Sequence, residues 1–427
     1  MVISIFLGSL LGSMALGMPI AFALLICGVA LMYNMDLFDA QIVAQNVING
    51  ADSFPLMAVP FFMLAGEIMN VGGLSRRIVR LAMTLVGHIK GGLGYVAILA
   101  AVILASLSGS AVADAAALSA LLVPMMVQAG HDKARSGGLV AASGIIAPVI
   151  PPSIGMIMFG VAGGVSITQL FLAGIVPGIL LGLSLVVAWM LLVRKEQLVT
   201  PARASRREMV TALIDSFWAL MLPLIIIFGL KFGIFTPTEA AVVAAVYSLV
   251  VATFVYRELK LSDLYGVFLT AAKTTSVVMF LVAAAMVSAW MITVADLPGV
   301  VTELLEPLLD SPTLLLLAIM ALVILIGTAM DMTPTILILT PVLLPVVKQA
   351  GIDPVYFGVL FIMTNSIGLI TPPVGTVLNV VAGVAKISME EVIKGVLPFI
   401  LAHLAVLILL ILFPSILTVP AAFLSGR

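Results

Sequence analysis

Two short stretches place hydroxyl groups, glycine and a carboxylate inside apolar sequence. The first is SLSGSAVAD (106–114), and Asp114 is the only charged residue between positions 91 and 130. The second is GTAMDMT (327–333), which contains Asp331. Hydroxyl and carbonyl oxygens are ligands that hard cations accept. Both stretches are therefore candidates for binding a small cation or a polar substrate.

A few charged side chains occur within these apolar segments. Asp114 and Asp331 are costly inside a membrane, which favours a functional role such as coupling. Either could instead cap the helix that follows it, since Asp is a good N-cap residue. We expect Glu67 and Glu239 to lie near helix ends in a structural role, and the Lys273 side chain to reach toward the membrane surface.

Two further stretches contain consecutive prolines. They are ASGIIAPVIPPSIGM (142–156), with Pro151 and Pro152, and TNSIGLITPPVGT (364–376), with Pro372 and Pro373. Proline interrupts a helix and frees carbonyl groups that the helix would have used. The helix that restarts after each pair points its N-terminal N–H groups at the break, which suits an anion, while the freed carbonyls suit a cation.

The composition decides the class of protein that carries these stretches. Of 427 residues, 63% are hydrophobic and 9% are charged, whereas soluble domains have about 25% charged residues. Long continuous apolar runs recur, so the sequence predicts an all-α polytopic membrane protein. A single cysteine excludes a disulfide framework, three scattered histidines form no zinc pattern, and no phosphate-binding G-x-x-x-x-G-K-[ST] motif occurs. Nothing in the sequence indicates nucleic-acid binding.

The chain contains an internal duplication. When residues 124–152 are aligned with 345–373, ten of 29 paired positions are identical, and the two Pro-Pro pairs coincide. We predict a first repeat at 1–193, a cytoplasmic linker at 194–212 and a second repeat at 213–427. The segment 194–208 is basic and 295–312 is acidic, so the positive-inside rule orients the second repeat opposite to the first.

Each repeat is predicted to have about five transmembrane segments and a re-entrant hairpin. The hairpins are placed at about 91–129 and 312–350. The expected segments are 1–17, 18–33, 54–71, 136–164 and 168–193, then 213–230, 237–256, 273–292, 355–385 and 396–418. The stretches LSRRIVRLAMTLVGHIK (74–90) and SMEEVIKGV (388–396) are expected to form amphipathic helices in the membrane interface.

The chain resembles the large membrane (M) subunit of tripartite ATP-independent periplasmic (TRAP) transporters over nearly its whole length. The resemblance is carried by PFFMLAGEIMN, SLSGSAVADAAALSALLVPMM, GIIAPVIPPSI, FTPTEAA, MDMTPTILILTPVLLP and NSIGLITPPVGTVLN. It implies an elevator-type fold, with a scaffold and a moving transport domain, in the bacterial inner membrane. It also implies sodium-coupled import of organic acids such as C4-dicarboxylates, sialic acid or sugar acids.

The resemblance further implies site residues and partners. Sodium ions, as coupling ions, would be bound by Ser106, Ser108, Ser110 and Gly144, and by Gly327, Met330, Thr333, Asn365 and Gly368. The carboxylate substrate would lie near Ser108, Ser153, Asn365 and Thr376. The partners would be a small membrane (Q) subunit and a periplasmic substrate-binding protein. No enzymatic activity and no other cofactor are expected.

Two alternatives remain open at this stage. A self-sufficient sodium/dicarboxylate transporter would share the hairpin architecture and need no partner proteins. More remotely, Asp114 and Asp331 could form the carboxylate pair of an intramembrane aspartyl hydrolase, although neither lies in a G-x-G-D pattern.

Overall fold

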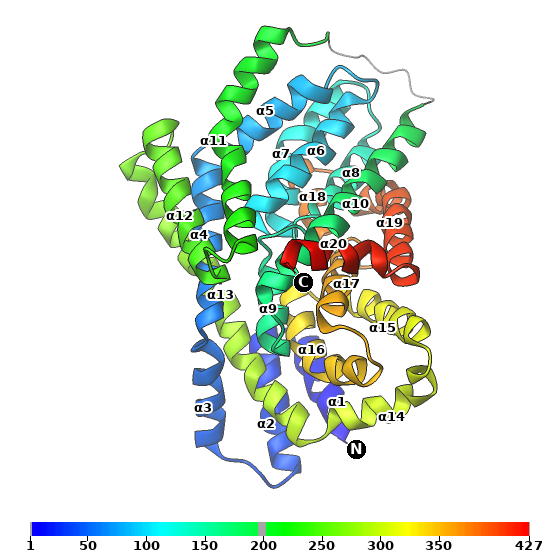
Figure 1. Cartoon of the computed structure of the whole chain (residues 1–427). Helices are drawn as coiled ribbons and strands as arrows, with labels where there is room; N and C mark the ends of the chain where they lie inside the picture. Colours follow the sequence, from blue (N-terminus) through cyan, green and yellow to red (C-terminus); the bar gives the residue numbers. More distant parts are fainter. Residues whose placement is uncertain (1, 195–201, 427) are drawn as a thin grey trace.

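The structure is a computed structural model that describes residues 2–194 and 202–426, and its regular elements in these residues are all helical (Figure 1). The helices before the midpoint of the chain are α1 (Val2–Ala15), α2 (Ile20–Asn34), α3 (Ala40–Ala51), α4 (Ala58–Val71), α5 (Leu74–Val86), α6 (Gly92–Ser108), α7 (Ala111–Gln128), α8 (Lys133–Gly144), α9 (Ile154–Gly163) and α10 (Ile167–Val193). A short 3-10 helix, η1 (Phe54–Met57), precedes α4.

The helices after the midpoint are α11 (Arg206–Lys231), α12 (Pro237–Val250), α13 (Leu261–Val294), α14 (Leu297–Leu309), α15 (Pro312–Gly327), α16 (Met332–Gln349), α17 (Pro354–Gly368), α18 (Thr376–Ala385), α19 (Met389–Leu412) and α20 (Ser415–Ser425). A π-helical turn, η2 (Val251–Val255), extends α12. Part of the basic segment 194–208, residues 195–201, lies outside the described residues.

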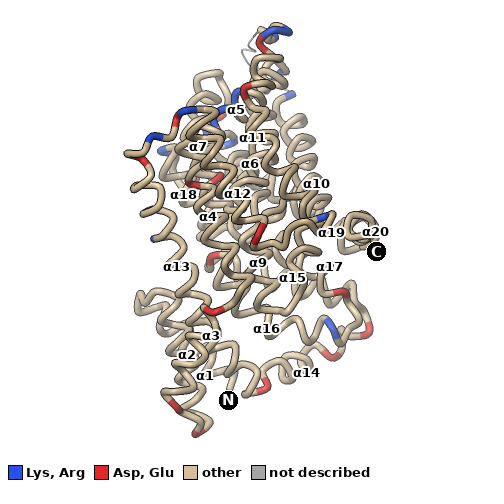
Figure 2. Tube along the Cα trace, turned by 60° about the vertical axis from the view of Figure 1, so that its left-hand side comes forward, with Lys and Arg blue, Asp and Glu red and all other residues tan. Residues whose placement is uncertain are grey.

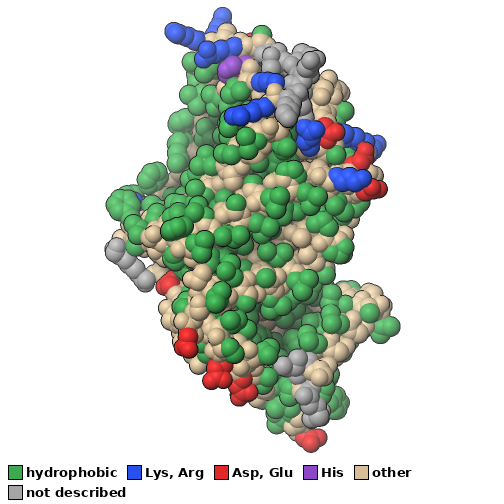
Figure 3. Space-filling view, turned by 90° about the vertical axis from the view of Figure 1, so that its right-hand side faces the viewer, with side chains coloured by type: hydrophobic (Ala, Val, Ile, Leu, Met, Phe, Trp, Pro, Cys, Tyr) green, Lys and Arg blue, Asp and Glu red, His purple; other side chains and the backbone are tan. Residues whose placement is uncertain are grey.

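The described residues form a polytopic membrane protein. Eight helical segments in them are long and apolar enough to cross a bilayer. Figure 2 shows most lysine and arginine at the end of the molecule near α5 and the start of α11, and much of the aspartate and glutamate toward the opposite end near α14. The face in Figure 3 carries hydrophobic side chains between these ends. This band is the surface that hydrocarbon would cover.

The helices pack in two groups. The first, here called the frame group, contains α1–α4 and α11–α13, with α13 lying against α2, α3 and α4. The second, here called the hairpin group, contains α6–α10 and α15–α20. Amphipathic α5 packs on α11 and α6, and α14 packs on α13 and α16, so each of them lies where the groups meet.

Ion pairs and a cation–π contact hold α5 against α11 and the segment after η2 at the basic end. Arg76 and Arg77 pair with Glu258 at 2.7 and 2.6 Å, and the Arg77 guanidinium stacks on the Tyr256 ring at 3.8 Å from its centroid. Arg80 pairs with Asp215 at 3.3 Å. The basic stretch at 74–80 and the stretch YRELK at 256–260 therefore lie together.

Several boundaries follow the sequence closely. The hairpins expected at 91–129 and 312–350 are α6–α7 and α15–α16. The two segments with Pro-Pro pairs are each divided into two helices, and both Pro-Pro bonds are cis. Helix α11 already begins at Arg206, inside the segment 194–212, because Ser205 and Glu208 form a capping box there.

Three boundary predictions are wrong. Helix α13 begins at Leu261, twelve residues before the segment expected at 273–292. SMEEVIKGV does not form a separate interfacial helix, because Ser388 and Glu391 form the capping box that starts α19 and Glu390 pairs with Lys394 one turn later. The segment 396–418 is not one helix either. Helix α19 ends at Leu412, and Pro414, which cannot continue its hydrogen bonds, precedes α20.

Candidate functional site

The loop between α6 and α7, here called tip 1 (residues 106–114), is held by its own hydroxyl groups. The Ser108 hydroxyl donates to Asp114 Oδ1 at 2.5 Å and accepts from the Ser110 N–H at 3.2 Å. Gly109 has φ +61°, a conformation that glycine adopts without strain. Ser110 is the N-cap of α7 and accepts from the Ala113 N–H. Tip 1 thus turns tightly and keeps Asp114 buried.

Tip 1 lies directly on the first helix interruption, here called break 1 (residues 145–153). A Cβ atom placed on Gly109 would be 2.5 Å from the Pro152 carbonyl oxygen and 3.2 Å from Ser153 Cα. A Cβ atom on Gly144 would be 2.8 Å from the Cβ atom of Ala115. Small residues at these contacts let the backbones of tip and break touch.

The start of α9 is organised by Ser153. Its hydroxyl accepts from the Met156 N–H at 3.1 Å and donates to the Pro148 carbonyl at 2.5 Å. One buried side chain therefore caps α9 and also bonds a backbone carbonyl within break 1.

The second half repeats this arrangement between tip 2 (residues 327–333) and break 2 (residues 369–375). Gly327 and Gly368 touch, since a Cβ atom on Gly368 would be 2.8 Å from Gly327 Cα. The Asn365 amide donates to the Met332 carbonyl at 3.2 Å, and the Gly375 N–H donates to the Thr328 carbonyl at 3.1 Å. Tip 2 is thus tied to the end of α17 by close packing and one hydrogen bond, and to break 2 by a second hydrogen bond.

In this region, helices of each half pack on helices of the other half. Helix α9, which follows break 1, packs along α16, which follows tip 2, and α18 packs along α7 in the same way. A Cβ atom on Gly155 would be 2.8 Å from the Met332 sulfur. Both tips and both breaks therefore belong to one connected region inside the hairpin group, and the sequence-predicted site residues lie in it. They are Ser106, Ser108, Ser110, Gly144, Ser153, Gly327, Met330, Thr333, Asn365, Gly368 and Thr376, with Pro151, Pro152, Pro372 and Pro373 in the breaks.

Among the predicted sodium and substrate residues, two side-chain atoms are buried without a hydrogen-bond partner in the described residues, namely Asn365 Oδ1 and Thr376 Oγ1, and Asp114 Oδ2 in tip 1 also has none. Asn365 Oδ1 faces Gly327, whose added Cβ atom would be 3.2 Å from it. Burying such an oxygen without a partner costs free energy. Both oxygens are available to a ligand.

The two aspartates differ in their surroundings. Asp114 is buried and bonded to Ser108, whereas Asp331 is exposed and its side chain caps nothing, although it precedes α16. No hydrogen bond joins the two carboxyl groups in the part of the chain that the structure describes. This arrangement does not support the paired carboxylates of the hydrolase alternative.

A small cavity beside tip 1 is lined in part by Glu67, Asn70 and Thr274, for which the sequence predicts no binding role. It has a volume of about 80 Å³ and is lined on the frame side by α4 and α13 and on the other side by tip 1 and the start of α9. Its polar lining residues are Glu67, Asn70, Ser108, Ser110 and Thr274. The charge of Glu67 within the apolar run PFFMLAGEIMN was the available signal. Glu239 does have the expected structural role, since it forms a capping box with Thr236.

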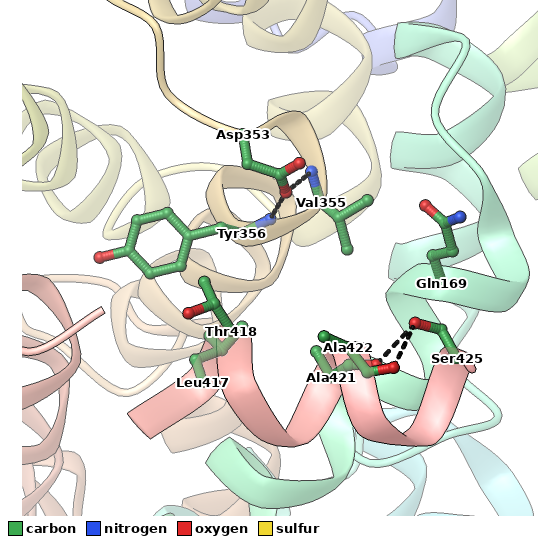
Figure 4. A pocket seen from close by; sticks show the side chains of 9 residues that line it. All are labelled: Gln169, Asp353, Val355, Tyr356, Leu417, Thr418, Ala421, Ala422 and Ser425. Atoms are coloured by element: carbon green, nitrogen blue, oxygen red, sulfur yellow. Dashed lines mark hydrogen bonds between the residues drawn. The ribbon is translucent and has the colours of Figure 1, made fainter. Parts of the chain in front are cut away.

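A larger pocket of about 260 Å³ lies under α20 and contains none of the predicted residues (Figure 4). Several of its polar groups already have local partners. Asp353 Oδ1 accepts from the N–H groups of Val355 and Tyr356, and the Ser425 hydroxyl donates to carbonyl groups of α20. No residue of the tips or breaks lines this pocket.

The family model described as the DctM component of the tripartite ATP-independent periplasmic transporter matches residues 7–416. The chain belongs to this family. It is therefore the large permease component of a TRAP transporter, a multi-pass protein of the bacterial inner membrane and not an enzyme.

Individual relatives agree with this assignment. This TRAP permease is 56% identical to the 2,3-diketo-L-gulonate TRAP transporter large permease protein of Escherichia coli (strain K12), and the match covers 100% of both chains. It is 38% identical to the isethionate TRAP transporter permease protein DctMQ of Oleidesulfovibrio alaskensis, over 94% of this chain and 64% of that protein.

A solved structure supports the fold. The YdaH transporter of Alcanivorax borkumensis superposes with a TM-score of 0.64 at 18% identity, covering 88% of this chain and 89% of the other. At this identity the likeness shows the fold alone, which is that of an all-helical polytopic membrane transporter.

Proposed function

We propose that this TRAP permease carries an organic acid across the inner membrane by sodium-coupled import. The observation that carries the proposal is the connected region of two tips and two breaks, which presents hydroxyl, carbonyl and amide groups but few charges. Such a region can bind cations through oxygen atoms and an anion through helix N-termini.

Each tip and its break would hold sodium. The first site would use Ser106, Ser108, Ser110 and Gly144, where the tip backbone rests on break 1. The second would use Gly327, Met330, Thr333, Asn365 and Gly368, where Asn365 Oδ1 is buried without a partner. A bound cation would reduce the repulsion among these oxygens and hold each tip on its break.

The substrate would lie between the sites, near Ser108, Ser153, Asn365 and Thr376. Ser153 and Thr376 are at the N-termini of α9 and α18, and these helix ends attract an anion. Two nearby sodium ions would strengthen the attraction, because charges interact strongly where water is excluded. This order, with sodium first and the acid second, couples the two fluxes. Asp114 would support tip 1 through Ser108.

We further infer that the halves 1–193 and 213–427 are inverted repeats and that the hairpin group moves against the frame group as an elevator. The sequence duplication and the exchanged packing of α9 with α16 and of α18 with α7 support the repeats. Helices α6 and α15 have 17 and 16 residues, fewer than the roughly 20 that span a bilayer, which supports re-entrant hairpins. The basic end would be cytoplasmic.

The partners would be a small membrane (Q) subunit and a periplasmic substrate-binding protein. The isethionate relative supports the first, because its name, DctMQ, joins both membrane components and this chain spans only 64% of its length. The diketogulonate relative supports an organic acid as substrate.

The test is uptake by proteoliposomes that contain the chain and its partner proteins. We expect a sodium gradient to drive accumulation of the acid that the binding protein delivers. Equal accumulation from a proton gradient in sodium-free buffer would refute sodium coupling. Accumulation by the chain alone would instead support a self-sufficient transporter.

A further inference from the structure

The cavity beside tip 1 adds a second wall to the proposed substrate region. Ser108 and Ser110 line it from the hairpin group, while Glu67 and Asn70 line it from α4 and Thr274 from α13. Phe62, Met63 and Ile154 close it with apolar surface. Its volume of about 80 Å³ corresponds to a few water molecules. It can therefore receive a few hydroxyl groups of a substrate whose carboxylate is held at the helix N-termini.

Glu67 is the unusual member of this wall. Its half-buried carboxylate lies in an apolar helix and has no hydrogen bond or ion pair with any described residue. An ionisable group at such a place is expensive, and a partner supplied by the substrate would account for it. Because a carboxylate accepts hydrogen bonds through both oxygens, substrate hydroxyl groups fit it.

The neighbouring side chains have complementary free groups. Asn70 Oδ1 accepts from the Ser75 hydroxyl at 3.0 Å, which leaves the Asn70 amide N–H groups free to donate. The Thr274 hydroxyl donates to the Thr270 carbonyl at 2.8 Å, so its oxygen can still accept. The side of the cavity formed by the frame group therefore offers acceptors at Glu67 and Thr274 and a donor at Asn70. Together these groups can form hydrogen bonds with substrate hydroxyl groups.

We propose that Glu67 and Asn70 make this permease selective for polyhydroxylated monocarboxylates over dicarboxylates. The inference rests on the proposed function and narrows its substrate class. A sugar acid would place hydroxyl groups on Glu67 and Asn70 while its carboxylate occupies the region between Ser108 and Ser153. A C4-dicarboxylate would instead place its second carboxylate against Glu67, and like charges brought together in this way oppose binding.

The experiment measures ligand binding by the full chain, purified with its small membrane subunit, so that selection by the binding protein plays no part. D-gluconate and succinate are titrated in sodium buffer and in potassium buffer, and apparent affinities are taken from shifts in melting temperature. The variants are Glu67→Gln and Asn70→Leu. Glu303→Gln is the matched control, because Glu303 is exposed on α14, outside the cavity.

For the wild type we expect gluconate to bind at least about tenfold more tightly than succinate, and only in sodium. Glu67→Gln should weaken gluconate and strengthen succinate, each by about tenfold, because it removes the charge and keeps the shape. A misfolded variant could not show these opposite changes. Asn70→Leu should weaken gluconate alone, and Glu303→Gln should change neither affinity.

Equal binding of both acids by the wild type would overturn the selectivity inference, and so would unchanged affinities in Glu67→Gln. In either case, sodium-dependent binding of one of the acids would still support the proposed function. A wild type that binds neither acid in sodium, and that shows no sodium-driven uptake with its binding protein, would overturn both proposals.

Discussion

The contact between Gly327 and Gly368 offers a direct test of sodium binding at tip 2. In Gly368→Ala the new methyl group would be 2.8 Å from Gly327 Cα and 3.0 Å from the Gly327 carbonyl carbon. Both are backbone atoms, so no side chain can rotate away. Overpacking of this kind costs about 1–3 kcal/mol. Alanine has a better helix propensity than glycine, which offsets this cost by up to about 1 kcal/mol. The offset is no larger because Gly368 is the last residue of α17.

The net loss of stability, about 0–3 kcal/mol, is small beside the stability of a typical protein. The strain acts mainly when tip 2 closes on break 2, which is the state that would hold sodium. A penalty of about 1–3 kcal/mol on that state corresponds to sodium binding weakened by about 5- to 150-fold. We therefore expect the sodium concentration for half-maximal uptake to rise by at least fivefold while membrane insertion is kept.

The assay is uptake in proteoliposomes, with the partner proteins present, over a series of sodium concentrations. Gly383→Ala is the matched control, because a Cβ atom on Gly383, in neighbouring α18, would have no atom within 4 Å. It should leave the sodium dependence unchanged. If Gly368→Ala gives the same sodium dependence as Gly383→Ala, then tip 2 and break 2 do not close around sodium, and the second proposed site is wrong.

Three further predictions concern tip 1, topology and assembly. Ser108→Leu removes the hydroxyl that bonds buried Asp114, whose Oδ2 already has no partner in the described residues, at a cost of about 1–3 kcal/mol. Sodium-driven uptake should fall by about 5- to 150-fold, and exposed Ser276→Leu, assayed in parallel, should not reduce it. A cysteine at Ser205 should react with a membrane-impermeant reagent only from the cytoplasm, and one at Ser311 only from the periplasm, whereas labelling from one side would exclude inverted repeats. Reconstitution of the chain without its small membrane subunit and binding protein should give negligible uptake, and robust accumulation would contradict the need for partners.

Local patterns in the sequence are sufficient for much of this fold. Apolar runs and few charges require a helical membrane protein, because hydrocarbon offers the backbone no hydrogen-bond partners. Proline pairs at 151–152 and 372–373 locate the two breaks, and the small polar residues at 106–110 locate a tip. These features act through the backbone of nearby residues and need no tertiary information.

Boundaries that depend on packing or capping were less predictable. The charged start of α19 resembles an interfacial helix in composition, but its capping box and the Glu390–Lys394 pair make it continuous with the apolar helix that follows. Helix α3 was not expected at all. Its packing along α13, far away in the sequence, stabilises a segment of modest hydrophobicity.

The sequence by itself determined the class of protein, the positions of the tips and breaks, and the residue types that could bind a cation and an acid. Only the tertiary structure decided which of them meet. Helix α9 of the first half packs on α16 of the second, and α18 of the second packs on α7 of the first, which brings both tips and both breaks into one region. Helix α4 packs beside tip 1 and thereby places Glu67 in the wall of a cavity. The physical reason is that a helix fixes which residues share its face, whereas long-range packing of helices chooses which faces touch.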